Sequence, residues 1–289
     1  MRLTSCALAL SFGLVACGDD SADDPPTPDA GVATSFSIPF SATVGGQPIS
    51  CSQPSMISGR SVEVRDFRMF VSNVEIVAAD GTRVPLTLEQ DGQWQDGEVA
   101  LMDFEDGTGG CSESGNAATH TTLVGTASVE SPTGIRFEIG VPFARNHFDT
   151  ATQPPPLSTG SMFWNWRGGY KFIRIDLRDG MNPFNVHLGS TACDASTAVE
   201  SPTRCDRPNR PTVVLSNVDF DRGIQLDLAQ LLTGSDTSTN TADTPPGCMS
   251  SPLEPEDCSP VFGSLGLDFA TGQCTTGDCM SQTFIQAMP

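Results

Sequence analysis

Short segments in which apolar and polar residues alternate recur along most of this chain, and alternation of period two is typical of half-buried β-strands. Gly45-Gly46 and Asp80-Gly81 are turn signals between such segments. The expected strands are 35–44, 62–77 with a phase slip near Asp66, 84–88, 99–104, 120–129, 135–141, 162–177, 184–188 and 212–218. Strands spaced about ten residues apart, separated by Gly- and Pro-rich turns, predict an all-β protein, an antiparallel β-sandwich or barrel with little helix.

Three stretches depart from this pattern. Residues 145–161 form a long polar excursion that contains Pro154-Pro155-Pro156, and Gly168-Gly169 predicts a turn or bulge within 162–177. Residues 223–232 (GIQLDLAQLL) are the best helix candidate, although their first half alternates. Residues 233–260 are rich in Ser, Thr, Asp and Pro, which predicts an acidic surface loop.

The N-terminus predicts export. Arg2 and the apolar run 7–16 indicate a signal peptide over residues 1–16, because the run is too short to span a bilayer. The sequence Leu-Val-Ala-Cys at 14–17 resembles a bacterial lipobox, which would place a lipid on Cys17. Residues 17–34 then predict a flexible acidic tether, and residues 35–289 a single β domain with long loops.

Eight cysteines remain beyond Cys6 and Cys17, and an even number in an exported chain predicts disulfides. The spacings do not suit a zinc ribbon. Pairing neighbours gives Cys193–Cys205, Cys248–Cys258 and Cys274–Cys279, which leaves Cys51–Cys111.

The charge is strongly negative, with 35 acidic residues against 15 basic ones and a net charge of −20. Such a surface repels phosphate backbones and anionic headgroups, so we expect no nucleic-acid partner and membrane contact only through the lipid. The chain has no P-loop, no GxGxxG, no HExxH and no GxSxG motif. A triad assembled from Asp176, His187 and Ser190 is no more than chance would offer, and we expect a protein that is not an enzyme.

Unusual residues gather in 146–176 and 184–193. These segments hold two of the three histidines, two of the three tryptophans, the only tyrosine and the only lysine. His147 and His187 on a rigid β scaffold could form a low-coordination imidazole site of the kind that copper accepts. The alternative is that both histidines are satisfied structural residues and that Trp164 and Trp166 are packing.

Several blocks together resemble a known family. They are DFRMFVSNVEI, VPFARNHFDTATQPPPL, SMFWNWRGGYKFIRID, FNVHLGSTAC, NRPTVVL and PGCMS, in this order between Ser35 and Phe269. They are similar to the MbnP-like copper-binding proteins, also called metallo-mystery-pair four-Cys-motif proteins.

The resemblance implies a periplasmic or cell-surface lipoprotein of a Gram-negative bacterium, on the outer membrane, that binds one copper ion as Cu(I). It implies two histidine ligands, His147 and His187, and a kynurenine made from Trp164 or Trp166 by a partner diheme enzyme of the cytochrome c peroxidase type. The two tryptophans lie two apart, so in a strand they would face the same side. His120 is the third candidate ligand. Met69, Met102, Met162 and Met249 are expected in the core or in loops.

A second hypothesis needs no metal. The aromatic strip 163–170 could contact a polysaccharide or another protein, which would make the chain a β-sandwich binding or adhesion module.

Overall fold

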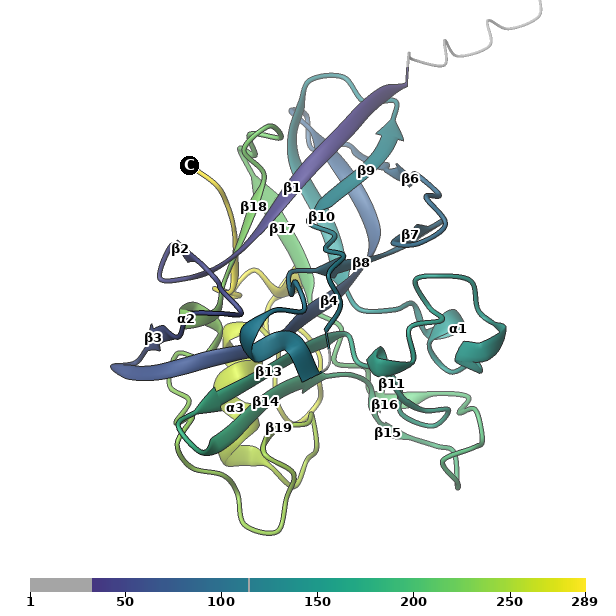
Figure 1. The fold of residues 1–289 in the computed structure, drawn as a ribbon. Helices are drawn as coiled ribbons and strands as arrows, with labels where there is room; N and C mark the ends of the chain where they lie inside the picture. The colour runs from purple at the N-terminus through teal and green to yellow at the C-terminus, as the bar shows by residue number, and fades with distance from the viewer. Residues whose placement is uncertain (1–32, 114) are drawn as a thin grey trace, which may run out of the picture. The chain divides into compact units, whose positions relative to one another are not determined.

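Two sheets pack face to face in this protein (Figure 1). Strands of both sheets contribute residues to one buried hydrophobic core. A computed structural model describes residues 33–113 and 115–289, which form one compact unit. The predicted signal peptide, Cys17 and all but the end of the predicted tether lie outside the described residues.

The smaller sheet is built around β1 (Thr34–Val44), in the order β20-β18-β1-β9-β6 with β2 added beside β1. Phe36, Ile38 and Phe40 of β1 are buried, as their alternation with polar residues predicts. β1 pairs antiparallel with β9 and parallel with β18. The other strands are β2 (Gln47–Pro48), β6 (Thr87–Leu88), β9 (Thr122–Ala127), β18 (Ile224–Asp227) and β20 (Ile285–Ala287).

The larger sheet is built around the long β4 (Arg60–Ala78), in the order β17-β10-β4-β13-β14-β19. The phase slip predicted near Asp66 is a register shift, since Asp66 pairs with Asp176 but Val64 pairs with Leu177. The other strands are β3 (Ser55–Ile57), β5 (Arg83–Pro85), β7 (Gln95–Asp96), β8 (Val99–Asp103), β10 (Pro132–Ile139), β13 (Ile173–Asp179), β14 (Asn182–Leu188), β17 (Thr212–Ser216) and β19 (Gly247–Cys248).

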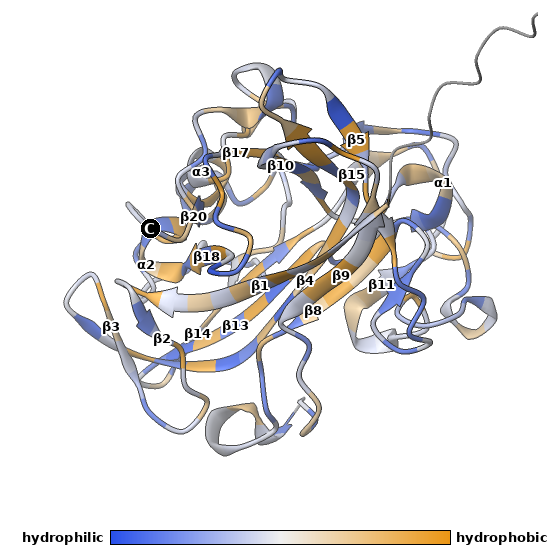
Figure 2. Cartoon of the chain, turned by 90° about the horizontal axis from the view of Figure 1, so that it is seen from above, coloured by the Kyte–Doolittle hydropathy of each residue, from blue (hydrophilic) through white to orange (hydrophobic). Residues whose placement is uncertain are grey.

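Aromatic side chains join the two sheets. Phe40 of β1 meets Phe137 of β10 edge to face, with ring centroids 5.8 Å apart. Phe284, just before β20, lies 6.4 Å from Phe67 of β4. Figure 2 shows β1 and β9 passing over β4, β8 and β13 with hydrophobic residues along the facing strands. The predicted all-β sandwich is confirmed, and two of its strand pairs, β1–β18 and β14–β19, are parallel.

Short elements lie outside the two sheets. The hairpins are β11 (Phe163–Asn165) with β12 (Gly169–Tyr170) and β15 (Thr191–Cys193) with β16 (Cys205–Arg207). The α-helices are α1 (Phe143–Asn146), α2 (Leu228–Leu231) and α3 (Pro255–Ser264), and 3₁₀ turns cover Gly109–Glu113, Thr150–Thr152, Gly160–Met162 and Gly277–Cys279. No helix in the described part of the chain is long and apolar enough to cross a bilayer.

The helix prediction was partly wrong. Within 223–232, the alternating first half is strand β18, and only residues 228–231 are helical, with the Asp227 side chain accepting from Ala229 N at the helix start. The longest helix among the described residues, α3, lies partly in the segment expected to be a loop. Its start signals are Pro255 and two acidic residues in the first turn. Val261 and Phe262 pack it on the core.

The four predicted disulfides are all confirmed. They are Cys51–Cys111, Cys193–Cys205, Cys248–Cys258 and Cys274–Cys279. Such bonds persist in oxidising compartments outside the cytoplasm, in agreement with the predicted export.

Candidate metal centre

The outer face of the larger sheet carries a row of charges. In β13 the residues Ile173, Ile175 and Leu177 face the core, so Arg174 and Asp176 face outward. Neighbouring β4 places Arg68 opposite Arg174 and Asp66 opposite Asp176.

The side chains in this row are largely buried, and the alternation of positive and negative charges stabilises them. Arg68 Nε donates to Asp66 Oδ1 at 2.8 Å, and Arg174 Nε lies 3.2 Å from Asp66 Oδ2. Arg174 also donates to Asp176 Oδ2 at 2.7 Å. Each buried charge therefore has an opposite charge beside it, which a buried charge requires, and the Asp176 carboxylate is held in place.

His187 of β14 is the end of this row. Its Nε2 lies 2.5 Å from Asp176 Oδ1. Burial lowers the pKa of His187, against the opposing effect of Asp176. Burial alone would raise the pKa of Asp176, but the hydrogen bond with His187 and the charge of Arg174 hold it well below its usual value.

These shifts fix the protonation of the pair near neutral pH. The carboxylate is charged, the imidazole is neutral, and its Nε2–H donates to Asp176. His187 Nδ1 then keeps its lone pair, and no hydrogen bond within the described residues engages it. A histidine oriented by a carboxylate through one ring nitrogen, with the other nitrogen free, is the usual form of a metal-ligating histidine.

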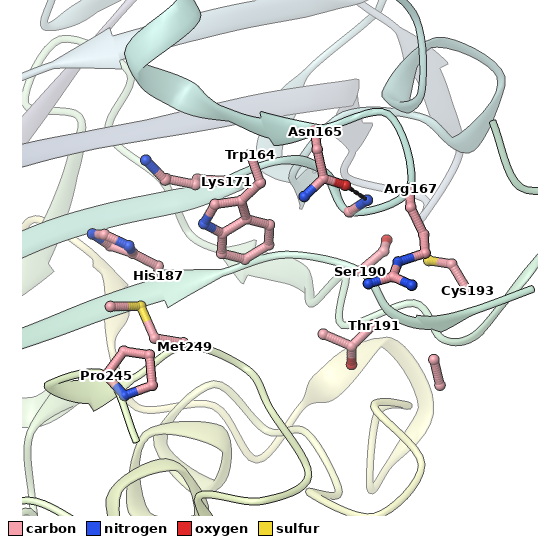
Figure 3. Close-up of a pocket in the computed structure, with 12 residues that line it drawn as sticks. Trp164, Asn165, Arg167, Lys171, His187, Ser190, Thr191, Cys193, Pro245 and Met249 are labelled. Carbon is pink, nitrogen blue, oxygen red and sulfur yellow. Dashed lines mark hydrogen bonds between the residues drawn. The ribbon is translucent and has the colours of Figure 1, made fainter. Parts of the chain in front are cut away.

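A cavity of about 700 Å³ lies beside His187. Its walls come from three separate segments, the β11–β12 hairpin, the end of β14 with β15, and the segment around β19. In Figure 3, the Met249 sulfur is turned toward His187, the Trp164 indole occupies the middle, and Arg167 and Cys193 lie at the far end. The cavity therefore brings an imidazole, a thioether and an indole to one place.

The two candidate tryptophans differ in position. Trp164 lies in β11 and lines the cavity, whereas β11 ends at Asn165 and Trp166 begins the following turn. Strand alternation does not reach Trp166, so the inference that both indoles share a face does not apply. Trp166 is 37% exposed and is not among the cavity-lining residues.

His147, at the end of α1, is buried beside the cavity wall rather than in the cavity. Its Nδ1 lies 2.9 Å from Trp166 O, and its Nε2 lies 3.1 Å from the Asn146 amide nitrogen. Burial lowers its pKa, so the ring is neutral near pH 7, donating to the Trp166 carbonyl and accepting from Asn146. Both ring nitrogens thus have protein partners, and a metal could reach Nε2 only if the Asn146 amide moved away.

The sulfur atoms nearest to His147 do not offer a thiolate site. His147, Cys193 and Cys205 present ligand-type atoms within 4.8 Å of one another, and Cys205 Sγ lies 3.6 Å from His147 Nε2. However, Cys193 and Cys205 are bonded to each other. Metals bind the thiolate form of cysteine, so this triplet does not fit a metal in the oxidised protein.

His120 lies in different surroundings. Its ring stacks on Trp94 with centroids 5.5 Å apart and 2° between the planes, and its Nδ1 lies 2.7 Å from Leu101 O. The sequence pattern gave no signal for Trp94, although its ring stacks on that of His120. Neither residue lines the cavity at His187.

The four methionines also separate. Met69, Met102 and Met162 are fully buried in the core, as expected, but Met249 lines the cavity. Its position next to Cys248, in the PGCMS block, was the available signal, because the Cys248–Cys258 disulfide and the β14–β19 pairing fix this segment beside β14.

Comparison with known proteins agrees with the sequence resemblance. A family model described as MbnP matches residues 33–250. The solved structure of MbnP from Methylosinus trichosporium superposes with a TM-score of 0.74 at 31% sequence identity, over 82% of this chain and 90% of that chain. No curated protein sequence matches at a significant level. The range matched by the family model includes His147, Trp164, His187 and Met249.

Proposed function

This chain belongs to the MbnP family, and from that premise we propose that it is an exported copper-binding protein and not an enzyme. The observation that carries the proposal is the state of His187. Asp176 holds its Nε2, while its Nδ1 is unpaired beside a cavity that also contains Met249 and Trp164.

The donor set fits monovalent copper. Cu(I) accepts imidazole nitrogen and thioether sulfur in low coordination numbers, and we propose His187 Nδ1 and the Met249 sulfur as donors. His147 is the second histidine that the family resemblance supplies. Its use requires the Asn146 amide to leave Nε2, so we propose that copper loading rearranges Asn146.

Trp164 is our candidate for conversion to kynurenine, because its indole lines the cavity and Trp166 does not. Cleavage of the indole C2–C3 bond by an external oxidant, with C2 released as formate, would supply an aromatic amine next to His187. The oxidation needs an external catalyst, and the family resemblance points to a diheme partner of the cytochrome c peroxidase type. We further propose that a lipid on Cys17 anchors the protein at the outer membrane, facing the periplasm or the cell surface.

Metal analysis and intact mass on protein purified from its own host test these parts together. We expect one copper ion per chain by metal analysis, and an intact mass that shows both the kynurenine shift and the lipid on Cys17. Copper-free protein carrying an unmodified Trp164 would contradict the copper and kynurenine proposals, and an unlipidated Cys17 would contradict the anchor.

Variants locate the copper donors. His187→Ala should abolish stoichiometric Cu(I) binding, and Asp176→Asn should weaken it by about 10- to 100-fold because the carboxylate orients the imidazole. Met249→Leu and His147→Ala should each weaken Cu(I) binding, because we propose the thioether and the second imidazole as further donors. His120→Ala, on the Trp94 stack, is the matched control and should bind like the parent. Unchanged copper affinity of His187→Ala would overturn the assignment.

The alternative, a metal-free module that binds through residues 163–170, meets a geometric limit. Tyr170 is fully buried and donates its hydroxyl to Leu157 O, and Phe163 packs against it at 4.9 Å. A partner would therefore contact Trp164 and Trp166 rather than a continuous aromatic strip. Function and thermal stability that do not change on copper removal would favour this alternative.

A further inference from the structure

The charged side chains that line the cavity at His187 have one sign. They are Arg167 and Lys171, and no aspartate or glutamate is among the lining residues. The chain as a whole has 35 acidic and 15 basic residues, and Lys171 is its only lysine. A cavity whose charged walls are cationic, in a protein this acidic, favours an anionic occupant.

The guanidinium of Arg167 is available to bind such an occupant. Its backbone N–H donates to Ala198 O at 3.3 Å, but within the described residues its guanidinium has no hydrogen bond and no ion pair. By contrast, Arg68 and Arg174 in the neighbouring charge row are paired with carboxylates. A free guanidinium presents donors in a fork that matches a carboxylate.

Lys171 is the second cation. Its Nζ donates to Ser161 O at 2.8 Å, which leaves donor capacity on the ammonium group. Burial, together with the nearby Arg174, lowers the pKa of Lys171 to about 8. An anion in the cavity would stabilise the charged form of Lys171, which burial and Arg174 disfavour.

Trp164 supplies a flat apolar surface between these cations. The indole packs on glycine, because a Cβ added at Gly189 would lie 2.4 Å from Trp164 Cζ3 and one at Gly168 would lie 3.4 Å from Cε3. In Figure 3 the indole stands between Lys171 and His187 on one side and Arg167 on the other. Rings that meet such a surface gain stacking energy beyond the area they bury.

The dimensions agree with a small molecule. A volume of about 700 Å³ lies within the range of ligand sites, and Pro245 and Met249 add apolar walls. We infer that this cavity binds a planar aromatic carboxylate, with its ring against Trp164 and its carboxylate on Arg167, while Lys171 on the other side of the indole adds positive charge to the wall. The inference concerns the copper-free chain with an intact Trp164 indole, and its two cations, Arg167 and Lys171, are not among the proposed metal donors.

The test uses the mature chain, expressed without the diheme partner so that the Trp164 indole is intact, and freed of metal with a chelator. Titration calorimetry measures the binding of 2-naphthoate as the probe. We expect 2-naphthoate to bind, and the neutral 2-naphthamide to bind about tenfold or more weakly, because a hydrogen-bonded charge is removed. Arg167→Met should weaken 2-naphthoate by about tenfold and leave 2-naphthamide unchanged. Arg222→Met, on an exposed arginine outside the cavity, is the control and should match the parent.

Other outcomes overturn the inference. Equal affinity for 2-naphthoate and 2-naphthamide would show that the carboxylate charge contributes nothing to binding. An Arg167→Met variant that binds 2-naphthoate as tightly as the parent would show that Arg167 does not bind the carboxylate. Full binding by Trp164→Leu would refute the stacking surface, and no binding of 2-naphthoate at all would refute the site. His187→Ala separates the two proposals, because it should lose copper and retain 2-naphthoate.

Discussion

At the scale of single residues, burial of a carboxyl group without a full set of partners makes the stability of the fold depend on pH. Asp103, at the end of β8, is 1% exposed, and its Oδ2 has no hydrogen-bond partner among the described residues. Burial raises the pKa of Asp103 to about 7, against the lowering effect of Arg68 and with a further increase from Glu105. Asp103 is thus a point at which folding opposes ionisation.

The sign of the resulting pH dependence follows from that shift. In the unfolded chain an aspartate has a pKa near 3.9, so between about pH 4 and pH 7 the folded state binds the extra proton. The free energy of unfolding should therefore fall as pH rises through this window, by up to about 4 kcal/mol from this group.

Replacing Asp103 tests this dependence. Asp103→Asn should raise the free energy of unfolding at pH 8 by about 2 to 4 kcal/mol and flatten its decline between pH 4 and pH 7. Urea unfolding of the parent and the variant across that range is the measurement. Asp243→Asn, an exposed position, should leave the profile as it is, and a variant less stable than the parent at pH 8 would contradict the account.

At the scale of elements, disulfides hold the long connections against the sandwich. Cys51–Cys111 closes a sequence separation of 60 residues that includes all of β4 and β8, whereas Cys274–Cys279 closes a separation of 5. A cross-link that closes a longer loop removes more conformational freedom from the unfolded chain. The two bonds should therefore stabilise the fold by different amounts.

Paired substitutions separate these contributions. Cys51→Ala with Cys111→Ala should lower the free energy of unfolding by about 4 kcal/mol, and Cys274→Ala with Cys279→Ala by about 2 kcal/mol. Chemical denaturation of both double variants under identical conditions gives the comparison. A larger loss from the short loop would show that native-state packing at Cys279, and not loop closure, dominates.

At the scale of the whole molecule, the chain has a net charge of −20, and charges of one sign repel one another. The ion pairs with exposed partners, such as Arg204–Asp206, offset little of this repulsion because exposed pairs are weak. Screening should therefore favour the folded state.

Salt dependence measures this balance. We expect the Tm to rise as sodium chloride increases from about 0.01 M to about 0.15 M, since the Debye length shortens from about 30 Å to about 8 Å. Potassium chloride should act equally if the effect is screening and not binding of one cation. A falling Tm would mean that attractive ion pairs outweigh the repulsion.

The sequence by itself predicted an all-β sandwich or barrel, most of its long strands and the four disulfide pairs. Side-chain alternation is a local property of an extended chain, so segments such as 35–44 and 135–141 could be assigned without knowing their partners. Neighbouring cysteines needed only short loops between them. The sequence also singled out the segments that carry His147, Trp164 and His187, and its family resemblance is confirmed.

Only the tertiary structure decided what those side chains meet. The cavity joins residues from 164–171, 187–193 and 245–249, which the pairing of β14 with β19 and the Cys248–Cys258 disulfide bring together. Only the tertiary structure showed that the Asn146 amide hydrogen-bonds to His147 Nε2 and that Asp176 orients His187. It also showed that Met249 lines the cavity. The physical reason is that strand formation depends on local side-chain patterns, whereas the partners of a ring nitrogen depend on contacts between segments far apart in the chain.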